Sequence, residues 1–178
     1  RPGLFVPLFR HRAGYEDLLV TNETDLCIDG FPRSANSFAV GAVQHAQPTP
    51  IGIAHHTHVP ANPMQACEWG IPTVVLIRNP YDAVVSIVAL QKEVRDDASP
   101  APVSVRDRLH AWRVFYRALG PYRERGDLLV APFSVVIQDM GRVIEHVNAH
   151  FGTDFAPFTH TEAAAAAVHE ARGVHAGP

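Results

Sequence analysis

Short apolar runs alternate with helical patterns along this chain, and this alternation limits the fold more than any other feature. The run at 72–77 ("PTVVLI") is short, unbroken and rich in β-branched residues, which predicts a buried strand. A helix start follows, because Asn79 is a good N-cap, Pro80 suits the first helical position and Asp82 falls in the first turn. A buried strand that leads directly into a helix is the unit of a parallel α/β sheet.

The same alternation extends over most of the 178 residues. We predict further strands at Leu26–Gly30, 51–55 and 127–132, and further helices at 36–47, 104–125, 138–151 and 161–172. Segment 1–24 is expected to be an irregular arm, 55–63 a His- and Pro-rich loop, and 92–103 a mobile loop. Helical spacing assigns four side chains of 104–125 to the core: Trp112, Phe115, Tyr116 and Leu119. The pattern predicts one domain, residues 1–178, with a parallel β-sheet flanked by helices on both faces.

The composition is that of an ordinary soluble globular protein, with 47% apolar and 19% charged residues. A formal net charge of −3 gives no overall attraction to nucleic acid or to an anionic membrane, so an anion site must be a local cluster. The two cysteines, Cys27 and Cys67, form no CxxC motif or disulfide framework, and no apolar run reaches the roughly 18 residues of a membrane span. With no secretory signal in the sequence, we expect a cytoplasmic protein.

Two loops with an arginine follow predicted strands directly, at the strand ends where α/β sheets bind ligands. In the first, "GFPRSANS", Arg33 precedes a helix start whose N–H groups favour an anion, and Ser34, Asn36 and Ser37 add neutral donors. A nucleoside triphosphate loop would read G-x-x-x-x-G-K-[ST]. Here Ala35 takes the place of the second Gly and no Lys follows, which counts against magnesium-dependent phosphoryl transfer. A tight turn with a surface arginine is the plain alternative.

The second loop, "RNPYDAVVS", runs from Arg78 to Ser86 and completes a resemblance. With "PRSANSF" at 32–38, it resembles the "PKSGTTW" and "RNPKDVAVS" motifs of the sulfotransferases that depend on PAPS, 3′-phosphoadenosine 5′-phosphosulfate. Between the two, "HTHVP" at 56–60 resembles the "KTHLP" segment of that family, and "GDLLVAPFS" resembles a later strand and turn. The resemblance covers roughly residues 25–152 and implies a P-loop NTPase-like α/β fold that uses no metal.

The resemblance implies a role for each residue of the two loops. Arg33 would stabilise the bridging oxygen that gains negative charge as the sulfuryl group leaves, and as an arginine it could act only electrostatically. The 5′-phosphosulfate end would be held by one run of loop residues: Ser34, Ala35, Asn36 and Ser37. Phe38 would pack on the adenine ring, and Arg78 with Ser86 would bind the 3′-phosphate.

The resemblance also implies that His58 is the general base, because a neutral imidazole near pH 7 can take the proton of an attacking hydroxyl or amine. His56 stands where the family often has Lys and could donate to a sulfate oxygen. A loop without function and a metal site made by His55, His56 and His58 are the other interpretations. We expect no metal, because no carboxylate or Cys lies nearby in the sequence.

Three features depart from the family's pattern. Its "YED" turn is replaced by "APFS", and its late Arg-Lys-Gly clamp has only a weak counterpart in Arg172 and Gly173. The chain is also short for this family, so the elements of the acceptor site are reduced, mobile, or supplied by a partner chain such as a second copy in a homodimer.

We therefore expect an enzyme that moves a sulfuryl group from PAPS to a hydroxyl or amine of a small-molecule acceptor. Its nucleotide product would be PAP, adenosine 3′,5′-bisphosphate. One alternative is a catalytically reduced module that binds PAP or PAPS, and a less favoured one is a small-molecule phosphotransferase.

Overall fold

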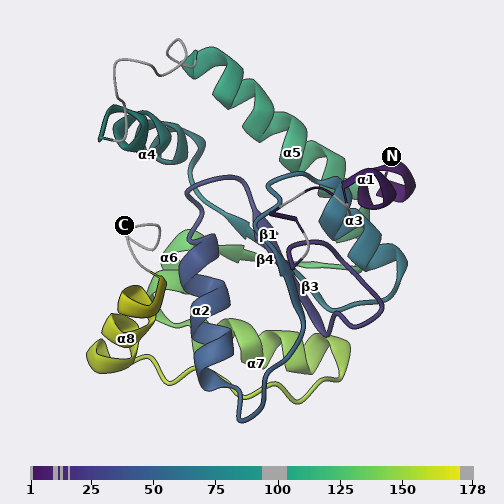
Figure 1. Ribbon diagram of the computed structural model, residues 1–178, viewed down its shortest axis with the longest axis vertical. Helices are drawn as coiled ribbons and strands as arrows, with labels where there is room; N and C mark the ends of the chain where they lie inside the picture. The colour runs from purple at the N-terminus through teal and green to yellow at the C-terminus, as the bar shows by residue number, and fades with distance from the viewer. Residues whose placement is uncertain (1, 10–11, 13, 16, 94–103, 173–178) are drawn as a thin grey trace.

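A single parallel sheet organises the described part of the chain, which in this computed structural model comprises residues 2–9, 12, 14–15, 17–93 and 104–172. The elements follow one another in the order α1 (Pro2–Phe9), β1 (Leu26–Gly30), α2 (Asn36–Ala46), β2 (Ile53–His55), α3 (Ala61–Glu68), β3 (Thr73–Ile77), α4 (Pro80–Glu93), α5 (Val105–Arg125), β4 (Leu129–Pro132), α6 (Phe133–Gln138), α7 (Met140–Phe151) and α8 (Glu162–Arg172). The sheet order is β2-β1-β3-β4, and each neighbouring pair is parallel. The predicted parallel α/β sheet is confirmed (Figure 1).

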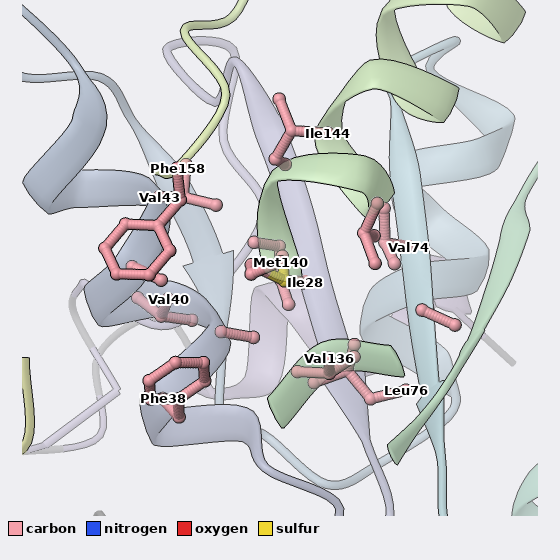
Figure 2. Close-up of a cluster of buried hydrophobic side chains, with 14 of the residues drawn as sticks. Ile28, Phe38, Val40, Val43, Val74, Leu76, Val136, Met140, Ile144 and Phe158 are labelled. Atoms are coloured by element: carbon pink, nitrogen blue, oxygen red, sulfur yellow. The ribbon is translucent and has the colours of Figure 1, made fainter. Parts of the chain in front are cut away.

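Helices cover both faces of this sheet, as the sequence pattern predicts. Alternate side chains of a strand point to opposite faces, so β1 and β3 each contribute to two cores. On one face, Ile28, Val74 and Leu76 pack with side chains of α2, α6, α7 and α8 (Figure 2). On the other face, Val75 packs with α4 and α5, and Cys27 packs with α3. Strands that are buried on both sides explain the unbroken apolar runs in the sequence.

Four helices depart from the sequence-based expectations. The arm expected to be irregular contains α1, which begins at Pro2 and packs against α3. The His- and Pro-rich loop is shorter than expected, because α3 begins at Ala61 and tolerates Pro63 in its first turn. The helix expected over 138–151 begins only at Met140, since Asp139 leaves helical geometry and separates α7 from the extra helix α6.

The ends of the other helices follow their local signals. The Asn79 Oδ1 atom accepts a hydrogen bond of 2.9 Å from the backbone N–H of Tyr81 and so caps α4 as expected. Gly152, in the left-handed region at φ 71°, ends α7. Helix α4 includes the first two residues of the expected mobile loop at 92–103, whose remainder lies outside the described residues. No helix in the described ranges is long and apolar enough to span a membrane.

Candidate functional site

The carboxyl ends of β1 and β3 form the crevice at which this sheet is expected to bind a ligand. The two strands are neighbours, with Gly30 opposite Leu76. The chain leaves β1 for α2 on one face of the sheet and leaves β3 for α4 on the other face. This divergence is the topological switch point of an open α/β sheet. The loops that carry Arg33 and Arg78 meet there, since Arg78 Nη1 donates to the backbone oxygen of Arg33 over 3.1 Å.

A cavity of about 480 Å³ opens at this crevice. Its polar lining consists of Arg33, Asn36, Ser37, His56, His58 and Arg78. Its apolar lining includes Phe38, Leu90, Phe133, Ile137 and Ala165, and His169 of α8 completes it. No carboxylate of the described residues lines the cavity, so its electrostatic character suits an anion with an apolar or aromatic part.

The first loop leaves the start of α2 open to an anion. Ala35 is the N-cap residue of α2 and has no side-chain oxygen to accept from the first turn, so no side chain caps these N–H groups. Arg33 and Ala35 both have positive φ, 66° and 69°. Gly30 is required beneath the loop, because a Cβ there would lie 2.5 Å from the Leu76 backbone oxygen.

The two predicted anion-binding arginines are held close together. Arg33 Nε donates to Ser86 Oγ over 2.8 Å, which joins the first loop to α4. The Arg78 guanidinium carbon lies 4.1 Å from the centroid of the Phe133 ring, in cation–π geometry. Partial burial lowers the pKa of Arg78, with Asp82 opposing the shift and Arg33 adding to it, yet a guanidinium stays protonated at neutral pH. The site therefore keeps two fixed positive charges.

The loop after β2 brings the predicted base to the same cavity. His58 Nδ1 lies 2.8 Å from the backbone oxygen of Gly30, and because a carbonyl oxygen only accepts, Nδ1 must carry the proton. In the neutral ring, Nε2 is then the nitrogen with a free lone pair, as a general base requires. His56 Nε2 lies 2.9 Å from Ser37 Oγ, and His56 Nδ1 lies 2.8 Å from His55 Nδ1. Both ring nitrogens of His56 thus have protein partners.

Three residues support this arrangement in ways the sequence reasoning missed. Asp29 is fully buried in β1 and bonds to the loop that carries His58. The Tyr116 hydroxyl donates to the Leu76 oxygen over 2.7 Å and accepts from the Phe31 N–H over 3.3 Å. Trp112 Nε1 donates to the Arg78 oxygen over 3.2 Å. The spacing that assigns Trp112 and Tyr116 to the core cannot show that their polar atoms hold two strand ends.

The cavity gathers most of the predicted site residues, with three differences. Ser86 of α4 does not line the cavity. Ser34 is fully buried beside Tyr116, so its side chain does not line the cavity. Phe38 is only 4% exposed, and its ring stacks on His169 of α8 at 5.3 Å between centroids. A ligand that reaches Phe38 therefore also meets His169. Among the described residues, no group of three or more His, Cys, Asp or Glu is arranged to hold a metal ion.

Comparisons with known proteins agree with the fold. No protein-family model matches the chain, and no curated protein matches it in sequence. Among solved structures, the crystal structure of mouse sulfotransferase SULT7A1 complexed with PAP matches with a TM-score of 0.57 and 14% sequence identity. The match covers 90% of this chain and 67% of the mouse chain. The chain therefore has the α/β fold of a sulfotransferase, and at this identity the likeness concerns the fold alone.

Proposed function

We propose that this chain is a sulfotransferase that moves a sulfuryl group from PAPS to a hydroxyl or amine of a small-molecule acceptor. The observation that carries the proposal is the convergence of Arg33, Arg78 and His58 on one cavity of a sulfotransferase fold. The PAP complex of the mouse protein supports the choice of nucleotide. The cytoplasm is the proposed setting, and a metal is not part of the proposal.

The residues present fit such a donor. The uncapped start of α2, with Asn36 and Ser37, would hold the 5′-phosphate. Arg78 would hold the 3′-phosphate together with Ser86, whose Oγ accepts from Arg33 Nε in this structure. The apolar end of the cavity, where Phe38 and His169 meet, would take the adenine ring. PAPS would supply an activated sulfuryl group.

In the proposed transfer, His58 and Arg33 act on opposite sides of the sulfur. His58 Nε2 takes the proton from the acceptor oxygen or nitrogen as that atom forms its bond to sulfur. Arg33 stabilises the negative charge that gathers on the bridging oxygen as the sulfur–oxygen bond breaks. The products are the sulfated acceptor, PAP and a proton on His58, which passes to solvent.

Binding is tested by thermal unfolding with PAP in EDTA and, in parallel, with ATP and Mg²⁺. Because a ligand at 100 times its Kd adds about 2.7 kcal/mol to the unfolding free energy, PAP should raise the Tm by several degrees. Stabilisation by ATP with Mg²⁺ but not by PAP would contradict the proposal and favour a phosphotransferase.

Transfer is tested with PAPS and a panel of phenols, alkanols and primary amines. His58→Ala should lower kcat by roughly 10²- to 10⁴-fold and leave the Kd of PAP within about threefold. Arg78→Ala should weaken PAP binding by at least about tenfold. Arg142→Ala and His146→Ala are matched controls, since both residues line a separate hollow of about 230 Å³ beside β4. PAP binding without transfer to any panel member would favour a module without catalysis.

A further inference from the structure

Asp29 is a charged residue in the middle of a buried strand, and the proposed transfer does not account for it. Its side chain is 0% exposed, although β1 is otherwise apolar apart from Gly30. A buried carboxylate is unfavourable unless polar groups surround it. Val75 lies opposite Asp29 in β3, so packing within the sheet does not by itself call for a charge at this position. The carboxylate therefore calls for an explanation beyond packing.

Within the described ranges, every hydrogen-bond partner of the Asp29 carboxylate is a donor. Oδ1 accepts from the N–H of Gly30 over 2.8 Å and from the N–H of His58 over 3.2 Å. Oδ2 accepts from the N–H of Thr57 over 3.1 Å and from its hydroxyl over 2.6 Å. Burial raises the pKa of this carboxyl, while His58 and the donors oppose the shift. Since a protonated carboxyl would lose one of these bonds, the ionised form fits the site at neutral pH.

The carboxylate lies at the edge of the His58 ring that the Gly30 oxygen also contacts. Asp29 Oδ1 is 3.7 Å from His58 Nδ1, and that nitrogen donates to the Gly30 oxygen. Both contacts fall on Nδ1, which leaves Nε2 for the cavity. The other titratable groups near the pair are Tyr116 and Cys27 beside Asp29, and His56, whose ring centroid lies 5.7 Å from that of His58. Arg33 and Arg78 line the same cavity as His58.

We propose that Asp29 is the positioning residue for His58, and that its charge stabilises the imidazolium formed when His58 accepts the acceptor's proton. The carboxylate fixes the loop through the N–H groups of Thr57 and His58, so the ring keeps its Nδ1–H tautomer. When Nε2 takes the proton, the new positive charge faces a buried negative charge at close range, where water screens little. This inference rests on the proposed function and assigns a second residue to the proton transfer.

Two variants separate the charge of Asp29 from its anchoring of the loop. Asp29→Asn removes the charge and nearly keeps the shape, but its amide nitrogen cannot accept the hydrogen bonds of the oxygen that it replaces. The second variant therefore controls for a lost hydrogen bond. Thr57→Val removes the shortest hydrogen bond to the carboxylate and leaves the charge in place. Asp29→Asn should lower kcat at least about tenfold with the best acceptor of the panel, while the KM for PAPS and the Kd of PAP stay within about threefold. Thr57→Val should keep kcat within about threefold of the wild type.

A measurement on the unmodified protein keeps the proposal testable if Asp29→Asn does not fold. Comparison with His58→Gln identifies the ¹⁵N NMR signals of His58. In the neutral ring these signals should show that Nδ1 is protonated and Nε2 is unprotonated. An unprotonated Nδ1 in the neutral ring would overturn the proposal, and so would an Asp29→Asn protein with unchanged kcat. Equal losses of kcat in Asp29→Asn and Thr57→Val would show that Asp29 only holds the loop and that its charge has no role in the transfer.

The binding of PAP separates a failure of this inference from a failure of the proposed function. If the wild type does not bind PAP, the proposed function itself fails. If it binds PAP and transfers the sulfuryl group, each of these outcomes bears on Asp29 alone.

Discussion

Backbone strain in the described chain is concentrated at four residues. Arg33, Ala35, His56 and His58 are the non-glycine residues of the described ranges with positive φ, between 54° and 69°. Arg33 and Ala35 lie in the loop after β1, and His56 and His58 lie in the loop after β2; all four line the cavity. An L-residue in this left-handed region costs roughly 1–2 kcal/mol, so the surrounding contacts must hold the loops in place. Strain of this kind gathers where function fixes the backbone, which is consistent with the proposed site.

Ala35 gives the clearest test of this strain, because its side chain is a single methyl group. Ala35→Gly should raise the unfolding free energy by about 0.5–1 kcal/mol, since relief of the left-handed strain exceeds the added freedom of glycine in the unfolded chain. Urea unfolding measures the change. Ala111→Gly, at an exposed helical position in α5, is the control and should lower the unfolding free energy by about 1 kcal/mol. A loss of stability in Ala35→Gly would show that the loop is not strained at this residue.

At the scale of elements, the strands and most helices follow from the sequence because their signals are local. The apolar run of β3 and the cap at Asn79 lie within a few residues of each other. Helices α1 and α3 carry Pro7 and Pro63, which obscure the helical pattern, and α6 is too short for one. Their formation depends on packing against elements that are distant in sequence.

The candidate site divides in the same way. The arginines, Ser37 and His58 could be placed by motif and by the rule that ligands bind at strand ends. The supporting contacts could not, because Tyr116 reaches Leu76 across 40 positions and Asp29 reaches His58 across 29. For Asp29, the one signal in the sequence is an acidic residue within the otherwise apolar run "LCIDG". The sequence pattern thus predicts the residues that face the ligand better than it predicts the residues that support them.

The contact between β1 and β3 is the element-scale feature on which the crevice depends. Gly30→Ala would place a Cβ 2.5 Å from the Leu76 oxygen, and a backbone atom cannot move aside as a side chain can. We expect a loss of about 2–3 kcal/mol in unfolding free energy, measured by urea unfolding, with weaker PAP binding because the two loops separate. Gly3→Ala is the control, since a Cβ there meets nothing within 4 Å. Equal stability of the two variants would show that the strands can spread without cost.

At the scale of the whole molecule, the site lies where the central strands end, so binding should be coupled to global unfolding. Strand β1 pairs with both β2 and β3 and carries Gly30 beneath the first loop. A ligand that bridges the loops after β1 and β3 would therefore stabilise the sheet as a unit.

Cysteine reactivity reports on this coupling. Cys27 is 0% exposed in β1, and burial raises its pKa well above the ordinary value. Burial also raises the pKa of Cys67 to about 11, with the negative charge of Asp127 adding to the shift. The thiolate is the reactive form, so at pH 8 both thiols should react with iodoacetamide far more slowly in the native protein than in the unfolded chain.

In a Cys67→Ser protein, the reaction of Cys27 should follow the fraction of unfolded chain. PAP at 100 times its Kd should slow this reaction about 100-fold, because it adds about 2.7 kcal/mol to the free energy of the opening that exposes β1. ATP with Mg²⁺ should have little effect, and the same concentration of PAP should protect the Arg78→Ala protein much less. If PAP raises the Tm yet leaves the Cys27 reaction unchanged, Cys27 becomes exposed by a local opening that spares the crevice. The sheet and the site would then not be one cooperative unit.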